Sequence, residues 1–174
     1  FEKLQSYGLH PQRMCGTGIV CTIGSGGKTI LLRADMDALP IQEDTGLPFA
    51  CQNGTAHACG HDMHTAMLLA AAKMLSETQD ELKGTVKLMF QPAEEALKGA
   101  TAMMEAGVLE NPKVDAAFAI HVTTGHENFP TGSIQYVRGV AFGACDMFRI
   151  TVKGKECHGA YPCRGIDPIN IGSR

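Results

Sequence analysis

The stretch Thr-Ile-Leu-Leu-Arg-Ala-Asp, residues 29–35, decides the class of fold. It is a short apolar run between a glycine-rich turn and a pair of acidic residues, which is typical of a strand in a buried sheet. Residues 84–90 and 114–121 form two more runs of this kind, and each of them ends at polar residues. Residues 16–23 alternate apolar and small side chains, which predicts a further strand.

Helices are predicted between these strands. Residues 64–75 are rich in Ala, Met and Leu on nearly every face, which predicts a helix buried between layers. Residues 94–106 predict a second helix, which Gly107 ends, and residues 1–9 predict the end of another helix, which Gly8 closes. The order strand, helix, strand, helix, strand favours an α/β fold with a mostly parallel sheet flanked by helices.

The pattern changes in the last third of the chain, where residues 133–138 and 146–153 both predict strands. Earlier in the chain, residues 40–56 carry little periodicity and predict a loop. The two strands of the last third are the start of a different pattern. We place a domain boundary in this region, so that residues 1–143 form one domain. Residues 144–174 then begin a second, smaller α+β domain.

Length and composition limit the classes of function. A chain of 174 residues suits one domain, or one domain and part of another. Its 44% hydrophobic and 19% charged residues are ordinary for a globular protein. A net charge of -3 gives no electrostatic reason to expect binding to nucleic acid or to an anionic membrane surface. No apolar run approaches the ~20 residues of a membrane-spanning helix.

The cysteines indicate the cellular compartment, and the two ends of the sequence bear on whether it is a whole protein. Seven cysteines at irregular spacing, without a CxxC pair or a visible signal peptide, argue against a disulfide framework and favour reduced thiols in a cytoplasm. The sequence begins at Phe1 rather than Met, and it stops at Arg174 without completing a helix or strand. We therefore expect a piece of a longer protein, truncated at both ends.

The densest group of chemically active side chains is His-Ala-Cys-Gly-His-Asp-Met-His-Thr, residues 57–65. Imidazole nitrogens, thiolates and carboxylates bind divalent transition metals. Taken alone, a Cys-Gly-His sequence is more typical of a loop or core than of a metal site. Further ligands elsewhere in the chain are needed to favour the metal.

Such ligands follow the predicted strands. Asp35 and Asp37 follow the first buried strand, Glu94 and Glu95 follow the second, and His121 ends the third. Sites in open α/β sheets are assembled at the carboxyl ends of the strands, so these groups are expected to converge there. A Glu-Glu pair at a helix start can also serve only to complement the helix dipole.

Convergence of Cys59, His61, Glu95 and His121 would give one thiolate, two imidazoles and one carboxylate. That set suits zinc, with cobalt, nickel or manganese as alternatives.

Five segments together resemble a known family: residues 31–40 (Leu-Leu-Arg-Ala-Asp-Met-Asp-Ala-Leu-Pro), 57–65, 90–95 (Phe-Gln-Pro-Ala-Glu-Glu), 119–122 (Ala-Ile-His-Val) and 154–162 (Gly-Lys-Glu-Cys-His-Gly-Ala-Tyr-Pro). The chain resembles the hippurate hydrolase and N-acyl-L-amino-acid amidohydrolase family, which is related to aminoacylase within the dinuclear metallopeptidases. Each segment alone is weak, but five in order with compatible spacing are specific.

The resemblance implies a role for each matching residue. Cys59, His61, Glu95 and His121 correspond to metal ligands of the family, and Glu94 corresponds to its general base. The family holds two divalent metal ions per subunit, zinc or manganese. Its fifth ligand is a histidine near the carboxyl terminus, which has no counterpart because this chain ends first.

The resemblance also implies roles outside the ligand set. Asp37 corresponds to the family aspartate that orients a ligand during catalysis. Residues 1–143 would be the metal-binding catalytic domain, and residues 144–174 would begin a lid or dimerisation domain. His158 in that domain would reach the site of a partner subunit in a homodimer and help to bind the substrate.

These roles imply metal-dependent hydrolysis of the amide bond of N-acyl amino acids, of the hippurate or N-acetyl type, to a carboxylate and a free amino acid. One alternative is a truncated, catalytically inactive relative that binds metal but lacks the carboxyl-terminal histidine ligand. A second alternative makes Cys59 a nucleophile with a histidine as its base, which needs no metal.

Overall fold

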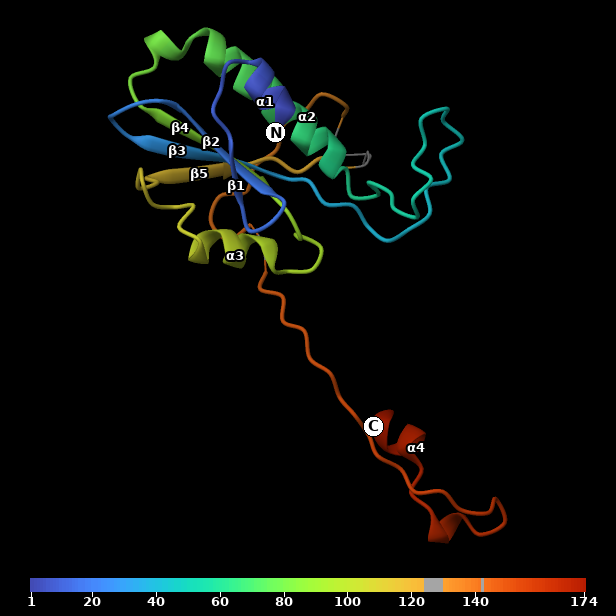
Figure 1. The fold of residues 1–174 in the computed structure, drawn as a ribbon. Coiled ribbons are helices and arrows are strands. Elements are labelled where there is room, and N and C mark those ends of the chain that lie inside the picture. Colours follow the sequence, from blue (N-terminus) through green and yellow to red (C-terminus); the bar gives the residue numbers. More distant parts are fainter. Residues whose placement is uncertain (124–129, 142) are drawn as a thin grey trace. The chain divides into compact units, whose positions relative to one another are not determined.

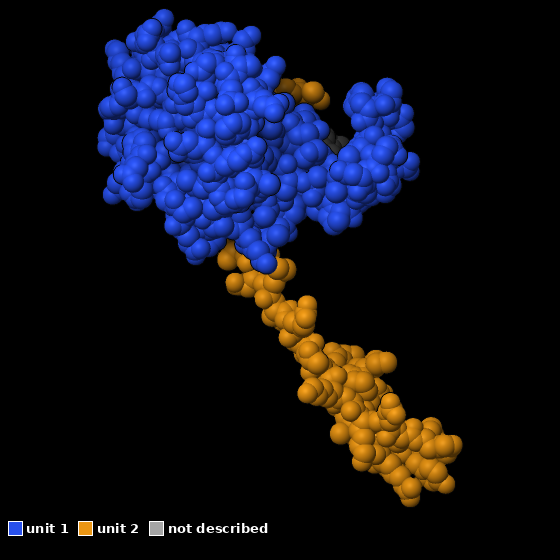
Figure 2. Space-filling view, in the orientation of Figure 1, with its two compact units in different colours: residues 1–124 blue, residues 125–174 orange. Residues whose placement is uncertain are grey.

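The computed structural model describes residues 1–123, 130–141 and 143–174. Its contacts divide the chain into two compact units, Phe1–Thr124 and Gly125–Arg174, which are coloured separately in Figure 2. These compact units do not define functional domains, so the division into a catalytic domain and the start of a second domain at residue 143 stays a prediction. In the part of the chain that the structure describes, no helix is long and apolar enough to cross a membrane.

The first unit is built on a five-stranded sheet with the strand order β1-β2-β4-β3-β5. The strands are β1 (Gln12–Met14), β2 (Gly18–Gly24), β3 (Thr29–Asp35), β4 (Thr85–Gln91) and β5 (Ala116–Ala119). β3 lies parallel to both β4 and β5, whereas β2 is antiparallel to β1 and to β4. The α/β class is confirmed, and the sheet is mixed because the short glycine-rich connection after β2 can only reverse the chain.

Helices cover both faces of the sheet. α1 (Glu2–Ser6) and α2 (His61–Glu77) lie on one face, and α3 (Gly99–Glu105) lies on the other (Figure 1). The single turns η1 (Gln79–Glu81) and η2 (Pro162–Arg164) and the short helix α4 (Pro168–Gly172) complete the described elements. The two helix layers follow from the crossovers that parallel strands require.

β4 is buried along its whole length and separates two hydrophobic cores. Successive side chains of a strand point to opposite faces, so Leu88 and Phe90 pack toward α1 and α2. Met89 packs on the other face against Met103 of α3. Burial on both faces fixes β4 in the middle of the fold.

The helix predicted over residues 94–106 is shorter than expected. α3 begins at Gly99, and residues 94–97 form turns instead. Ala93 and Leu97 have φ values of 52° and 55°, a left-handed conformation that an α-helix excludes. The prediction was wrong here because neither residue is a glycine, so the sequence carries no sign of the turn.

The strands predicted over residues 133–138 and 146–153 are also wrong, because both described segments lack secondary structure. Their apolar side chains are exposed; Phe148, for example, is 84% exposed. A strand requires a partner that pairs with its backbone N–H and C=O groups, and side-chain alternation does not supply one. The described ladder in the second unit is a single bridge between Lys155 and Ile166.

Lys87 of β4 is a buried cation, with only 2% of its surface exposed. Its ammonium group donates hydrogen bonds to the carbonyl oxygens of Val108 (2.9 Å), Glu110 (2.7 Å) and Pro112 (2.9 Å). Burial lowers the pKa of Lys87, an effect that the nearby charge of Glu110 partly opposes. The side chain therefore ties the segment after α3 to the central strand.

Replacing Lys87 with Met should lower the free energy of unfolding by about 3 kcal/mol, because three carbonyls lose their donor while the chain length of the side chain is kept. Urea denaturation followed by far-UV circular dichroism measures this. Lys73→Met is the matched control: Lys73 lies exposed on α2, 3.9 Å from Glu77, and its loss should cost less than about 0.5 kcal/mol. Equal stability of Lys87→Met and the parent would show that removing the buried charge offsets the lost hydrogen bonds.

Candidate metal centre

The parallel strands end level with one another. Arg33 of β3 lies opposite Met89 of β4 and Ala119 of β5, and Asp35 lies opposite Gln91. The segments that follow these three strands therefore leave from the same edge of the sheet, next to the start of α2. The predicted acidic residues and His121 follow the strands at this edge, where the Cys-Gly-His segment joins them.

Three sets of side chains at this edge could each hold a metal ion, and in each set the ligand atoms lie within 4.8 Å of one another. The sets are Cys59, His61 and His121; His61, Glu94 and Glu95; and Asp35, His61 and His64. His61 belongs to all three. The structure thus brings together the four predicted ligands and the predicted base, with His61 in the middle.

His61, the first residue of α2, is 1% exposed and holds a fixed orientation. Its Nδ1–H donates to the carbonyl oxygen of Asp37 at 3.0 Å and lies 3.3 Å from a carboxylate oxygen of the same residue. Its Nε2 has no hydrogen-bond partner and lies 3.6 Å from a carboxylate oxygen of Asp35 and 3.8 Å from one of Glu95. A buried imidazole nitrogen without a partner, opposite a carboxylate, fits a metal ligand whose other nitrogen is oriented by a hydrogen bond.

Cys59 and His121 complete the thiolate and imidazole part of the set. The Sγ of Cys59 lies 3.5 Å from Nε2 of His121, while Nδ1–H of His121 donates to the carbonyl oxygen of Val122 at 2.6 Å. Burial and the nearby carboxylates, Glu95 most of all, raise the pKa of the Cys59 thiol. Negative charge is therefore in excess around Cys59, and a divalent cation would compensate it.

Asp37 connects two of the predicted ligands. One of its carboxylate oxygens lies beside Nδ1 of His61, and the other accepts the backbone N–H of Glu95 at 3.1 Å. This geometry fits the predicted role, in which Asp37 orients a ligand and does not itself bind the metal.

The turn after β4 holds Glu94 and Glu95 in place. The carbonyl oxygen of Ala93 accepts the N–H groups of Lys98 (3.3 Å) and Gly99 (3.1 Å), which closes the turn around the two glutamates. A Cβ atom on Gly99 would lie 1.5 Å from the carbonyl oxygen of Pro92, so this position requires glycine. The two glutamates precede α3 and do not serve as its dipole-complementing first turn.

Asp35 and Arg33 form the part of the site that the sequence indicated least. Asp35 is 1% exposed; one carboxylate oxygen is 2.5 Å from Nδ1 of His64 and the other is 2.9 Å from the guanidinium of Arg33. Burial would raise the pKa of Asp35, but the hydrogen bond with His64 and the charge of Arg33 outweigh it and lower the pKa. Residues two apart on a strand point to the same face, and this was the signal for pairing Arg33 with Asp35.

His158 lies in the second unit, apart in sequence from the residues above. Its Nδ1 accepts the backbone N–H of Ala160 at 3.1 Å, and its ring centre is 5.9 Å from that of Tyr161. Its expected contact with substrate stays a prediction.

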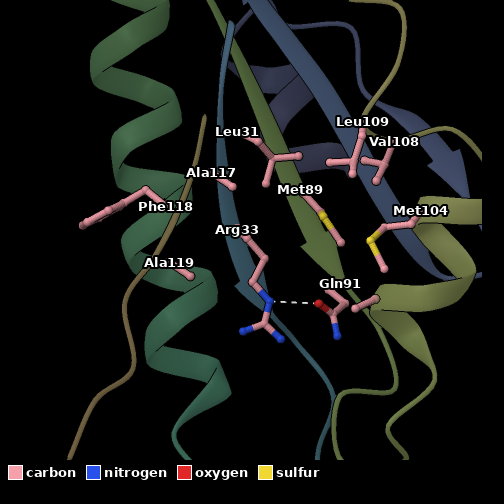
Figure 3. A pocket seen from close by; sticks show the side chains of 11 residues that line it. Leu31, Arg33, Met89, Gln91, Met104, Val108, Leu109, Ala117, Phe118 and Ala119 are labelled. Atoms are coloured by element: carbon pink, nitrogen blue, oxygen red, sulfur yellow. Dashed lines mark hydrogen bonds between the residues drawn. The ribbon is translucent and has the colours of Figure 1, made fainter. Parts of the chain in front are cut away.

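A cavity of about 270 Å³ lies on the α3 side of the sheet and contains none of the predicted site residues. Figure 3 shows its walls, which are mostly apolar, and the hydrogen bond of 2.9 Å that Arg33 donates to Gln91 within it. The cavity offers no cluster of carboxylates or imidazoles, so we assign the chemistry to the strand ends.

Comparison with known proteins identifies relatives of this chain. The model of peptidase family M20/M25/M40 matches residues 31–164. The N-acetyl-L-cysteine deacetylase of Bacillus subtilis is 47% identical over 88% of this chain and 36% of its own length. The N-acyl-L-amino acid amidohydrolase of Geobacillus stearothermophilus is 42% identical over the whole chain and 47% of its own length.

A solved structure of a Bacillus subtilis protein, described as a dinuclear metal binding peptidase from the M20 family, matches 70% of this chain with a TM-score of 0.65 and 46% identity. The match covers 35% of that protein. The chain thus spans less than half the length of these three relatives.

Gly60 should be indispensable to the ligand geometry, since it lies between Cys59 and His61 and a Cβ atom there would be 2.4 Å from the Val122 side chain. We expect Gly60→Ala to weaken zinc binding at least about tenfold, in the range typical of lost supporting contacts. Competition with a chromogenic chelator measures the affinity.

Gly54→Ala is the matched control for this substitution. Gly54 has a φ of +83°, close to the +80° of Gly60, but its Cβ would meet nothing within 4 Å. The control carries the same backbone strain without the clash and should bind zinc like the parent. Equal affinities of the two variants would contradict a role for the close contact with Val122.

Proposed function

The chain belongs to peptidase family M20/M25/M40, and we propose that it contributes the metal centre of an enzyme that hydrolyses N-acyl amino acids to a carboxylate and a free amino acid. The observation that carries this proposal is the unpartnered Nε2 of buried His61, which lies within 4 Å of carboxylate oxygens of both Asp35 and Glu95. The names of the relatives, a deacetylase and an amidohydrolase, support the substrate class.

Cys59, His61, Glu95 and His121 would hold the metal, and a count of two ions is supported by the dinuclear relative and by the two overlapping ligand sets around His61. The thiolate and imidazoles favour zinc on ligand softness, with manganese as the alternative. A bound divalent metal lowers the pKa of a coordinated water and polarises the amide carbonyl.

Glu94 is placed to act as the general base. It is half-buried beside His61, and its neighbour Glu95 is the one whose backbone Asp37 holds. In the proposed reaction Glu94 accepts a proton from the attacking water as the new C–O bond forms. It then delivers that proton to the amide nitrogen as the C–N bond breaks, so the amine leaves neutral.

The nucleophile alternative for Cys59 is disfavoured by its surroundings. A catalytic cysteine requires a lowered pKa, whereas burial and three nearby carboxylates raise the pKa of this thiol. The same carboxylates favour a bound divalent cation, and a thiol that binds such a cation loses its proton to do so.

The assignments outside the metal centre rest on the resemblance of residues 154–162 to the family's loop. We propose that His158 binds substrate, that residues 144–174 begin a lid domain, and that this domain pairs two subunits. A cytoplasmic location is supported by the seven cysteines, which are all free thiols.

Substituting the two adjacent glutamates should separate their roles in the complete gene product. Glu94→Gln should lower kcat for an N-acetyl amino acid by about 10²–10⁴-fold, the usual contribution of a general base, with metal content unchanged. Glu95→Gln should lower the metal content as well, because it removes a proposed ligand. Metal analysis and steady-state kinetics of both proteins test this, and metal loss from Glu94→Gln would contradict the assignment.

Metal removal tests the activity itself. The complete gene product should contain close to two metal ions per subunit and lose hydrolysis on confirmed removal by a chelator, and the added metal should restore it. Residues 1–174 on their own carry four of the ligands that the resemblance implies and should bind one ion tightly at most. Full activity after confirmed metal removal would overturn the proposal, and activity with a single ion would overturn the dinuclear assignment.

A further inference from the structure

His64 is a buried histidine that the proposed metal centre does not use as a ligand. It is 3% exposed, and both of its ring nitrogens are engaged. Nδ1 is 2.5 Å from a carboxylate oxygen of Asp35, and Nε2 accepts the backbone N–H of Val122 at 2.9 Å. No lone pair of this ring is left for a metal, which disfavours the set of Asp35, His61 and His64 as a metal site.

The hydrogen bonds of His64 define its protonation. Because Nε2 accepts an N–H, it carries no proton, so the proton must be on Nδ1, where it is donated to the Asp35 carboxylate. A neutral ring with its proton on Nδ1 is therefore the form that satisfies both partners. The ionised Asp35, paired with Arg33 at 2.9 Å, selects this form.

Val122, the partner of His64, is the residue that fixes His121. Its N–H is held by His64, its carbonyl oxygen accepts Nδ1–H of His121 at 2.6 Å, and its side chain lies against Gly60. β5 has already ended at Ala119, so no ladder of the sheet holds this segment. The hydrogen bond to His64 is what ties it to α2.

We propose that His64 is a positioning residue: held by Asp35, it fixes the backbone at Val122 and so sets the distance between Nε2 of His121 and Sγ of Cys59. This inference rests on the proposed function, because it assumes that both atoms bind a metal. The packing of the rings supports it, since the His64 ring lies 4.6 Å from that of His121 and 5.4 Å from that of His61.

Two conservative variants separate positioning from a merely structural role. In His64→Gln the amide reaches the place of Nε2 and can still accept the N–H of Val122, but the donor to Asp35 is lost. In His64→Asn the shorter amide occupies the place of Nδ1 and can still donate to Asp35, but the acceptor for Val122 is lost. Each variant keeps one of the two hydrogen bonds.

The complete gene product, stripped of metal and titrated with Co²⁺, provides the measurement. The affinity and the thiolate-to-cobalt charge-transfer band report the metal site, and urea denaturation of the metal-free proteins reports stability. We expect His64→Gln to keep the band and to bind within about threefold of the parent. His64→Asn should bind about 10–100-fold more weakly with a diminished band, as for other lost supporting partners of ligands.

The stabilities of the two variants should rank in the opposite order to their Co²⁺ affinities. His64→Gln leaves the Asp35 oxygen that faced Nδ1 without its donor and should lose at least as much stability as His64→Asn, because a hydrogen bond to a charged group is the stronger of the two. If His64 were only structural, cobalt affinity would follow stability, and His64→Gln would bind at least as weakly as His64→Asn. That result, or an unchanged band in His64→Asn, would overturn the inference while leaving the proposed function intact.

Two controls complete the design. His121→Ala removes a proposed ligand and should lose at least as much Co²⁺ affinity as His64→Asn. A parent protein that binds no Co²⁺ would overturn both the proposed function and this inference. Nitrogen NMR of the parent needs no variant to fold: it should show the His64 ring protonated on Nδ1 alone. A proton on Nε2 would overturn the inference.

Discussion

A buried carboxylate at the end of β3 determines how the site is assembled. Asp35 is 1% exposed, and an ionised side chain at that depth costs several kcal/mol unless it is paired and hydrogen-bonded. Its partners come from two elements, with Arg33 from the same strand and His64 from α2. Satisfying this one charge therefore fixes the first turn of α2 against the end of the central sheet.

Asp35 and Asp37 are the starting points of two supporting networks. Asp35 acts through His64 on the backbone at Val122, whereas Asp37, two residues later, acts on His61 and on the backbone of Glu95. Each aspartate thus connects two of the three segments that carry ligands. The candidate ligands are positioned by hydrogen bonds from residues that are themselves hydrogen-bonded. Support of this kind keeps the geometry of a metal site.

The sequence indicated the candidate ligands more directly than the residues that support them. Cys59 and His61 were predicted as ligands because thiol and imidazole groups cluster there and because the segment resembles a family motif, and their metal-binding roles stay predictions. The late start of α3 could not be predicted, because Ala93 takes a left-handed conformation that sequence patterns reserve for glycine. The bond between His64 and Val122 joins a side chain to a backbone N–H 58 residues away, and a backbone group carries no sequence signal.

The charge distribution explains why two adjacent glutamates can differ in role. Burial raises the pKa of the Cys59 thiol, and the carboxylates Glu95, Glu94 and Asp35 raise it further, so the surroundings of this thiol repel added negative charge. A divalent cation held by the candidate ligands, whose sets share His61, would relieve that repulsion. The backbone N–H of Glu95 is held by the carboxylate of Asp37, whereas the backbone carbonyl of Glu94 accepts only the local N–H of Leu97 among the described hydrogen bonds. This difference supports the proposal that Glu95 binds the metal and that Glu94 exchanges the proton.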